Sequence, residues 1–181
     1  MTHSDVRNGR PAAFLDRDGV LNVDTGYLHR PQDCVWKKNV PYALSLLRKS
    51  GFMIVVVTNQ SGVARGYYSE SDVNALHRWM NAHLQREGAN VDAFYYCPHH
   101  PDGSIEKYSV VCDRRKPAPG MLLEAIDEHG IDPSASLLIG DRETDLQAAE
   151  AAGVRGYLFN GDDLGHFVDW LLKHHDLSAL S

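Results

Sequence analysis

The sequence predicts a three-layer α/β fold, with helices on both faces of an open parallel sheet. Short apolar runs that end abruptly in polar residues alternate along the chain with segments of helical periodicity. Strands joined by helical crossovers pair in parallel, and buried parallel strands read as continuous apolar runs. The 181 residues, 43% of them hydrophobic, can fill one core without disulfides. We therefore expect a single domain over residues 1–181.

The first part of the chain predicts two strands joined by a helix. Residues 12–15 are apolar and stop at Asp16-Arg17-Asp18-Gly19, and residues 52–57 are apolar and stop at Thr58-Asn59. Between them, residues 40–49 carry apolar side chains at helical spacing. Because this order gives parallel pairing, both strands should end at the same edge of the sheet.

The same alternation continues to the end of the chain. Ser69 to Asp72 resembles a capping box and predicts the start of a second helix. The remaining predicted strands are residues 91–96, 136–139 and 156–159. Two more helices are predicted over residues 121–129 and 164–174, and residues 148–152 lie within another. An irregular segment rich in Pro and Gly, residues 97–119, interrupts the pattern.

Polar residues at three predicted strand ends indicate one site, because ligands of such sheets bind beyond the carboxyl ends of the strands. Asp16 and Asp18 follow the first strand, Thr58 follows the second, and Asp141 follows the strand at 136–139. Several carboxylates in one place suit a hard cation such as Mg²⁺. A hydroxyl group and the charge of Lys116 suit a phosphoryl group.

Four segments resemble, in order, the motifs of the haloacid dehalogenase (HAD) superfamily of aspartyl phosphotransferases. They are residues 14–20 (FLDRDGV), 57–59 (VTN), 116–117 (KP) and 139–145 (IGDRETD). Further segments resemble the bacterial D-glycero-D-manno-heptose 1,7-bisphosphate phosphatase family: residues 22–27 (NVDTGY), 58–66 (TNQSGVARG), 96–101 (YCPHHP) and 115–121 (RKPAPGM). The resemblance covers essentially residues 12–159. It implies a Rossmann-like, HAD-like sheet, and no interval between the motifs is long enough for a large cap domain.

The resemblance also implies a role for each strand-end residue. Asp16 would attack phosphorus to form an aspartyl-phosphate, and Asp18 would act as general acid and then as general base. Mg²⁺ would be held by Asp16, the main-chain carbonyl of Asp18 and Asp141. Thr58 and Lys116 would stabilise the phosphoryl oxygens.

The implied substrate is a heptose 1,7-bisphosphate that loses its C7 phosphate to give heptose 1-phosphate, a precursor for lipopolysaccharide or capsule. Arg115 would bind the phosphate that is not transferred, in bidentate fashion, and Arg142 would lie close to the substrate. Asp145 either orients the metal ligands or is an exposed carboxylate at a helix N-terminus. The other candidate substrate-binding residues are Asp24, Thr25, Gly26, Tyr27, Asn59, Gln60, Ser61 and Arg65.

A loop around residues 97–115 is a candidate zinc site. The family it resembles often carries Cys-x-His followed by Cys-x-Cys, and this chain has Cys97, His99 and Cys112 but Arg114 at the fourth position. A closed structural zinc site needs four ligands. The fourth ligand would be a water or one of three side chains: Cys34, His100 or Asp113.

Several alternatives stay open from the residues alone. The loop could be held without metal by packing of Tyr96, Tyr108 and its proline residues.

Histidinol-phosphate phosphatase, or another phosphatase of small phosphorylated metabolites, would share the catalytic motifs. A phosphorylation-dependent receiver domain also groups carboxylates, Thr and Lys around Mg²⁺, although its acceptor lies on a middle strand of the chain. A non-catalytic metal-binding module around the Cys and His residues is a third class. The tetrapeptide at 16–19 alone also fits a turn or a calcium loop, but the residues that follow it do not supply calcium ligands.

Charge and composition disfavour other classes of partner. The 18 Lys and Arg against 24 Asp and Glu give a net charge of −6, which argues against binding to nucleic acid or anionic membranes. The longest apolar run, residues 53–57, is far short of the ~20 residues of a membrane span. Three cysteines and a polar N-terminus predict a reduced, cytoplasmic protein. Nothing marks a dimer face, so we expect a monomer.

Overall fold

The computed structural model describes residues 9–174 and confirms the predicted α/β fold. Within this range five strands form one parallel sheet in the order β3-β2-β1-β4-β5. The strands are β1 (Ala12–Leu15), β2 (Met53–Asn59), β3 (Ala93–Cys97), β4 (Leu137–Gly140) and β5 (Arg155–Leu158). The helices are α1 (Val40–Lys49), α2 (Glu70–Arg86), α3 (Gly120–His129), α4 (Glu143–Ala151) and α5 (Leu164–His174). The outermost parts of the domain predicted over residues 1–181 lie outside the described range.

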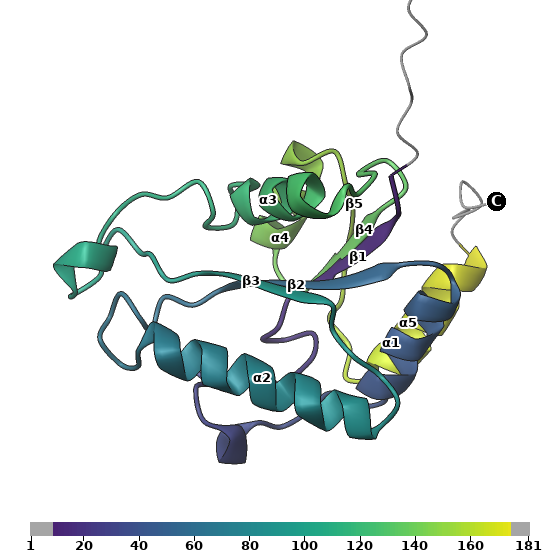
Figure 1. The fold of residues 1–181 in the computed structure, drawn as a ribbon, viewed down its shortest axis with the longest axis horizontal. Coiled ribbons are helices and arrows are strands. Elements are labelled where there is room, and N and C mark those ends of the chain that lie inside the picture. The colour runs from purple at the N-terminus through teal and green to yellow at the C-terminus, as the bar shows by residue number, and fades with distance from the viewer. Residues whose placement is uncertain (1–8, 175–181) are drawn as a thin grey trace, which may run out of the picture.

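The sheet lies between two helical layers (Figure 1). Helices α1, α2 and α5 cover one face, and α3 and α4 cover the other. Side chains of β1 alternate between the layers, since Ala13 and Leu15 belong to one apolar core and Ala12 and Phe14 to the other. This double coverage explains why β1 is apolar along its whole length.

The predicted element boundaries hold closely, with one difference that concerns the site. The predicted strand at 52–57 continues to Asn59, because Thr58 and Asn59 pair in register with Tyr96 and Cys97 of β3. The two polar residues are therefore held by the sheet and do not belong to a loop. The fourth strand starts one residue later than predicted, because the amide of Ser136 closes a turn onto the carbonyl of Pro133.

Helix α2 begins at the predicted capping box. The Ser69 hydroxyl accepts a hydrogen bond from the amide of Asp72, and the Asp72 carboxylate accepts one from the amide of Ser69. The segment after β3 contains a short 3₁₀ helix, Glu106–Tyr108, at the tip of a long loop that reaches beyond the sheet (Figure 1, left).

No large cap domain is present in residues 9–174, as predicted. The connection from β1 to α1 is a loop with a single 3₁₀ turn, Pro31–Asp33. No helix among the described residues has the length and apolar character that a bilayer span requires.

Candidate active site

Three of the four polar residues predicted at the strand ends, Asp16, Asp18 and Thr58, line one cavity. It has a volume of about 610 Å³ and opens beyond the carboxyl ends of β1 and β2. Its lining is Asp16, Asp18, Asp24, Gly26, Tyr27, Thr58, Asn59, Gln60, Ser61, Tyr68, Arg115, Lys116, Arg142, Glu143, Thr144 and Asp145. Most of the predicted catalytic and substrate-binding residues are in this set.

Lys116 lies in the floor of the cavity between two carboxylates. Its Nζ is 3.0 Å from Asp16 Oδ1 and 2.7 Å from Asp145 Oδ1, and it donates a 2.8 Å hydrogen bond to the carbonyl of Val57. The Asn59 side chain fixes the backbone of Lys116, because it accepts from the Lys116 amide and donates to the Lys116 carbonyl. The lysine side chain is 2% exposed, so these ion pairs are shielded from water.

Asp145 holds the start of α4 and is not an exposed helix-terminal residue. Its side chain is buried, and its Oδ2 accepts hydrogen bonds from the amides of Asp141 and Arg142 at 3.1 and 3.0 Å. Of the two sequence-based interpretations of Asp145, exposure is wrong, because the side chain turns inward to cap α4 and reach Lys116. The same bonds fix the backbone at Asp141, whose side chain is not part of the cavity lining.

Three carboxylates crowd together at this point. Single oxygens of Asp16, Asp141 and Asp145 all lie within 4.8 Å of one another, and Asp141 Oδ1 is buried without a hydrogen-bond partner. Gly19, at φ +90°, permits this approach, since a Cβ there would collide with the Asp141 carboxylate. Burial raises the pKa of Asp16 to about 7, against the opposing charge of Lys116. An unpaired buried oxygen and an excess of carboxylates over cations fit a hard divalent cation such as Mg²⁺.

Asp18 is held as a carboxylate by three neighbours. It accepts hydrogen bonds from Arg17 Nη2 at 3.0 Å, Asn22 Nδ2 at 2.9 Å and Gln60 Nε2 at 3.0 Å. Burial by itself raises the pKa of Asp18, but Arg17 and the hydrogen bonds from Asn22 and Gln60 outweigh it, so the net pKa lies below the usual range.

Gln60 links Asp18 to the wall of the cavity. Its Nε2 also donates to Thr58 Oγ1 at 2.8 Å, and its Oε1 accepts from the hydroxyl of Tyr68 at 2.8 Å. Tyr68 was not predicted from the sequence as a site residue. Its only sequence signal is its place just after the 58–66 segment, and a tyrosine at such a place more often serves only to pack against the core.

The rim of the cavity contains an ion pair and an uncompensated arginine. Arg142 Nη2 lies 2.8 Å from Asp24 Oδ2, which joins two of the predicted substrate-binding residues. Arg115 donates to the carbonyl of His99 at 3.2 Å and has no ion pair with a carboxylate among the described residues. Burial lowers the pKa of Arg115, and the charges of Arg65 and Arg142 lower it further. This side of the rim therefore favours an anion.

Two predicted substrate-binding residues are not part of the cavity lining. Thr25 is exposed, because the Asp24 carboxylate accepts from the amide of Gly26 and turns the loop. Arg65 is half-buried behind the rim, with its Nη2 3.5 Å from His100 Nε2.

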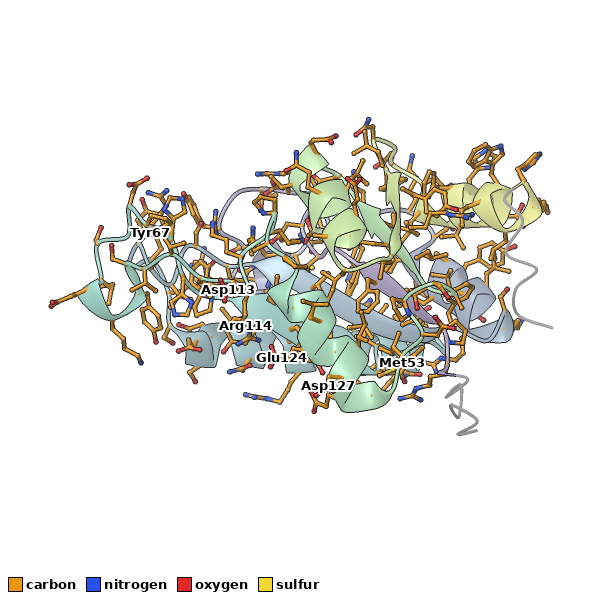
Figure 2. All side chains as sticks on the ribbon, turned by 90° about the horizontal axis from the view of Figure 1, so that it is seen from above. Met53, Tyr67, Asp113, Arg114, Glu124 and Asp127 are labelled. Carbon is orange, nitrogen blue, oxygen red and sulfur yellow. The ribbon has the colours of Figure 1, made fainter. Side chains whose placement is uncertain are left out.

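The predicted zinc residues also lie together, outside the cavity. Ligand atoms of Cys97, His99 and Cys112 fall within 4.8 Å of one another, with Cys97 Sγ 3.8 Å from His99 Nδ1. The Arg114 side chain pairs with Glu124 of α3, with 3.1 Å between Nε and Oε2. Figure 2 labels the two residues, which lie next to each other. Within residues 9–174 the cluster gains no fourth side chain, so Cys34, His100 and Asp113 do not complete it.

Two tyrosine hydroxyls, one from this loop and one from β3, bind Glu70 of α2. The hydroxyls of Tyr96 and Tyr108 donate to the Glu70 carboxylate at 2.8 and 2.6 Å. The loop is therefore anchored by hydrogen bonds as well as by packing.

The chain is similar to known phosphatases. A HAD-hydrolase-like family model matches residues 113–163. The D-glycero-beta-D-manno-heptose-1,7-bisphosphate 7-phosphatase of Rhodopseudomonas palustris is 44% identical over 181 residues, which is 100% of this chain and 99% of that one. The protein of the same name from Escherichia coli K12 is 51% identical over 144 residues, or 80% of this chain and 75% of that one. The crystal structure of D,D-heptose 1,7-bisphosphate phosphatase from B. bronchiseptica, complexed with magnesium and phosphate, has a TM-score of 0.78 and 31% identity, covering 91% of this chain and 99% of that chain.

We predict that Mg²⁺ binding weakens as the pH falls through about 7. The raised pKa of Asp16 means that its proton must leave before a cation binds. Its ionised form is about one tenth populated one pH unit below that pKa and mostly populated one unit above it, so the apparent Mg²⁺ affinity should change about tenfold across this interval.

In the metal-free protein, the contribution of Asp16 to the free energy of unfolding changes with pH in the opposite direction. A carboxyl group whose folded pKa is raised contributes stability below its unfolded pKa near 3.8, and that contribution is lost as the pH rises toward about 7. Titration calorimetry with Mg²⁺ at two pH values, with thermal unfolding of the metal-free chain, checks both trends. Equal affinity at both pH values would contradict the assignment of Asp16 as a ligand.

Proposed function

The chain belongs to the family of heptose 1,7-bisphosphate 7-phosphatases within the HAD-like hydrolases, and we propose that it removes the C7 phosphate of D-glycero-β-D-manno-heptose 1,7-bisphosphate. The observation that carries this proposal is a relative of that name that is similar along the entire chain. The convergence of Asp16, Asp18 and Lys116 on one cavity supports it. The β anomer follows the names of the relatives.

Asp16 is the nucleophile in this proposal. Its carboxylate oxygen forms a bond to phosphorus while the bond from phosphorus to the C7 oxygen breaks, which gives an aspartyl-phosphate and the alcohol. Water then attacks phosphorus, releases inorganic phosphate and regenerates Asp16. The ion pair with Lys116 at 3.0 Å keeps the nucleophile in one orientation.

Asp18 carries the protons. It donates a proton to the departing C7 oxygen and then accepts one from the attacking water. Its contacts to Arg17, Asn22 and Gln60 favour the carboxylate, the form that the second step needs and that the first step generates.

The remaining charges stabilise the transferred group. Asp16, Asp141 and the carbonyl of Asp18 would hold Mg²⁺, which supplies positive charge to the phosphoryl oxygens when it is bound. The Thr58 hydroxyl and the Lys116 ammonium group face the same cavity and stabilise the equatorial oxygens.

The second phosphate of the substrate is bound at the rim. Arg115 is a cation with no carboxylate partner among residues 9–174, and Arg65 and Arg142 add positive charge nearby. The second phosphate of a bisphosphate supplies the anion that Arg115 lacks. Histidinol phosphate has one phosphate, which the reaction removes, and the rest of the molecule carries an ammonium group and an imidazole but no anion for Arg115 to bind.

Zinc is proposed for the loop, with Cys97, His99 and Cys112 as the protein ligands and a water as the fourth. The 3.8 Å separation of Cys97 Sγ and His99 Nδ1 is compatible with both atoms binding one ion. The Glu124 carboxylate offsets the charge of Arg114, which would otherwise oppose the metal. Cysteine thiols stay available as zinc ligands in a reducing compartment, and all three cysteines are free. These observations support a cytoplasmic enzyme. We propose that it is a monomer.

Metal analysis of the purified chain tests the zinc proposal. We expect about one zinc per chain, retained in Cys34→Ser and lost in Cys112→Ser, because Cys34 is outside the cluster. A chain that takes up no zinc under reducing conditions, or a Cys112→Ser variant that keeps its zinc, would show that the loop is held without the metal.

Kinetics of Arg115→Ala test the substrate. Loss of the charge-assisted contact should lower kcat/KM for the bisphosphate by about 10- to 150-fold, or about 1.5–3 kcal/mol. A sugar 7-monophosphate, which lacks the second group, should be affected much less. Arg114→Ala is the matched control, because that neighbour pairs with Glu124 outside the cavity. An equal loss for both substrates, or a wild-type preference for histidinol phosphate, would overturn the bisphosphate assignment.

A further inference from the structure

Arg17 is a wholly buried guanidinium between the two catalytic aspartates in the chain. Its exposure is 0%, and it is among the largest fully buried side chains of the described residues. Nε and Nη2 donate to the Asp18 carboxylate at 3.0–3.3 Å, and Nη2 also donates to the carbonyl of Leu28 at 3.0 Å. Nη1 lies 3.1 Å from Nε2 of His77. A buried guanidinium needs a hydrogen-bond acceptor for each of its nitrogens, because unsatisfied buried donors cost free energy.

His77 provides the third of these partners from helix α2. The imidazole is buried and stacks on Phe94 of β3 at 4.6 Å, with Tyr96 at its edge at 6.0 Å. Arginine is always a donor, so Nε2 of His77 must be the acceptor and the ring proton must lie on Nδ1. Burial, reinforced by the charge of Arg17, lowers the pKa of His77 to about 3, so the ring is neutral.

We propose that His77 is a positioning residue for catalysis: by accepting the hydrogen bond from Arg17 Nη1, it fixes the guanidinium that holds the Asp18 carboxylate in place. The proposal rests on the proposed role of Asp18 as the acid and base. Asp18 itself follows the end of β1 and is not part of a strand. Its orientation therefore depends on side chains that are themselves fixed.

The geometry explains why the third contact matters. Two corners of the guanidinium are held by Asp18 and by the Leu28 carbonyl, both in the loop after β1. His77 belongs to a helix packed on the sheet, and its contact ties this loop to the rigid part of the fold. Without an acceptor, Nη1 would be a buried, unsatisfied donor, and Arg17 would shift toward water and take Asp18 with it. A displacement of about 1 Å in a catalytic group can cost about 100-fold in rate.

Three variants of α2 test this inference. His77→Leu keeps an apolar side chain but removes the acceptor, and we expect kcat to fall about 10- to 100-fold with KM changed less than about twofold. His77→Gln supplies a side-chain oxygen near the position of Nε2 and should restore kcat to within about threefold of the wild type. His83→Leu is the matched control, because that histidine stacks on Trp36 and Trp79 and does not contact Arg17.

Nitrogen NMR of the wild-type imidazole gives a readout that does not depend on activity. We expect His77 to be neutral, with a protonated Nδ1 and an unprotonated Nε2. A protonated Nε2, or an imidazolium ring, would overturn the proposal even if His77→Leu does not fold.

The variant Asp18→Asn separates this inference from the proposed function. If Asp18→Asn retains full turnover, the acid and base role of Asp18 is wrong, and the role of His77 is lost with it. If Asp18→Asn is inactive but His77→Leu turns over like His83→Leu, only the positioning role of His77 is wrong. A loss in His77→Leu that Gln does not restore would also contradict it.

Discussion

The buried ion pairs of Lys116 are the interaction on which the rest of the site depends. Among the described residues, its ammonium group is the one cation in direct contact with two buried carboxylates, those of Asp16 and Asp145. Through the carbonyl of Val57 it also joins the end of β2 to the residue that follows β1 and to the first turn of α4. Charge explains its importance, because carboxylates at this separation repel strongly in a medium of low polarity. The positions of these side chains therefore depend on the attraction between Lys116 and the two carboxylates as well as on the order of the strands.

In the proposed function, the chemistry and the recognition of the substrate fall to different parts of the fold. Asp16 and Asp18 follow the end of β1 and Thr58 lies at the end of β2, where sheet pairing limits movement, and Asp145 is held in helix α4. The residues proposed to face the sugar and the second phosphate lie mainly on loops, and the loop between β3 and α3 carries Arg115. That loop is fixed to α2 by Glu70 and to α3 by the ion pair of Arg114 with Glu124. Such anchoring limits the conformational entropy that Arg115 loses when it binds an anion.

Local pattern was sufficient to predict the sheet and the polar residues that follow its strands. Apolar runs that end in Asp or Thr mark strand ends, and a parallel sheet brings these ends to one edge. The pattern of apolar runs and strand ends does not predict hydrogen bonds between buried polar side chains. Arg17 and His77 are residue types that usually lie at the surface, and they are 60 positions apart, so no spacing rule joins them. The position of Asp145 depended likewise on a contact with Lys116 that only the tertiary fold creates.

The proposed mechanism requires that Asp16 becomes covalently phosphorylated during turnover. Rapid quenching of the enzyme with substrate labelled in the C7 phosphate, followed by borohydride reduction and peptide mass spectrometry, tests it directly. We expect residue 16 to be reduced to homoserine, and Asp16→Asn to carry neither the label nor the modification. A label on Asp18, Asp141 or Asp145, or steady release of phosphate with no labelled enzyme at any quench time, would show that Asp16 is not the nucleophile.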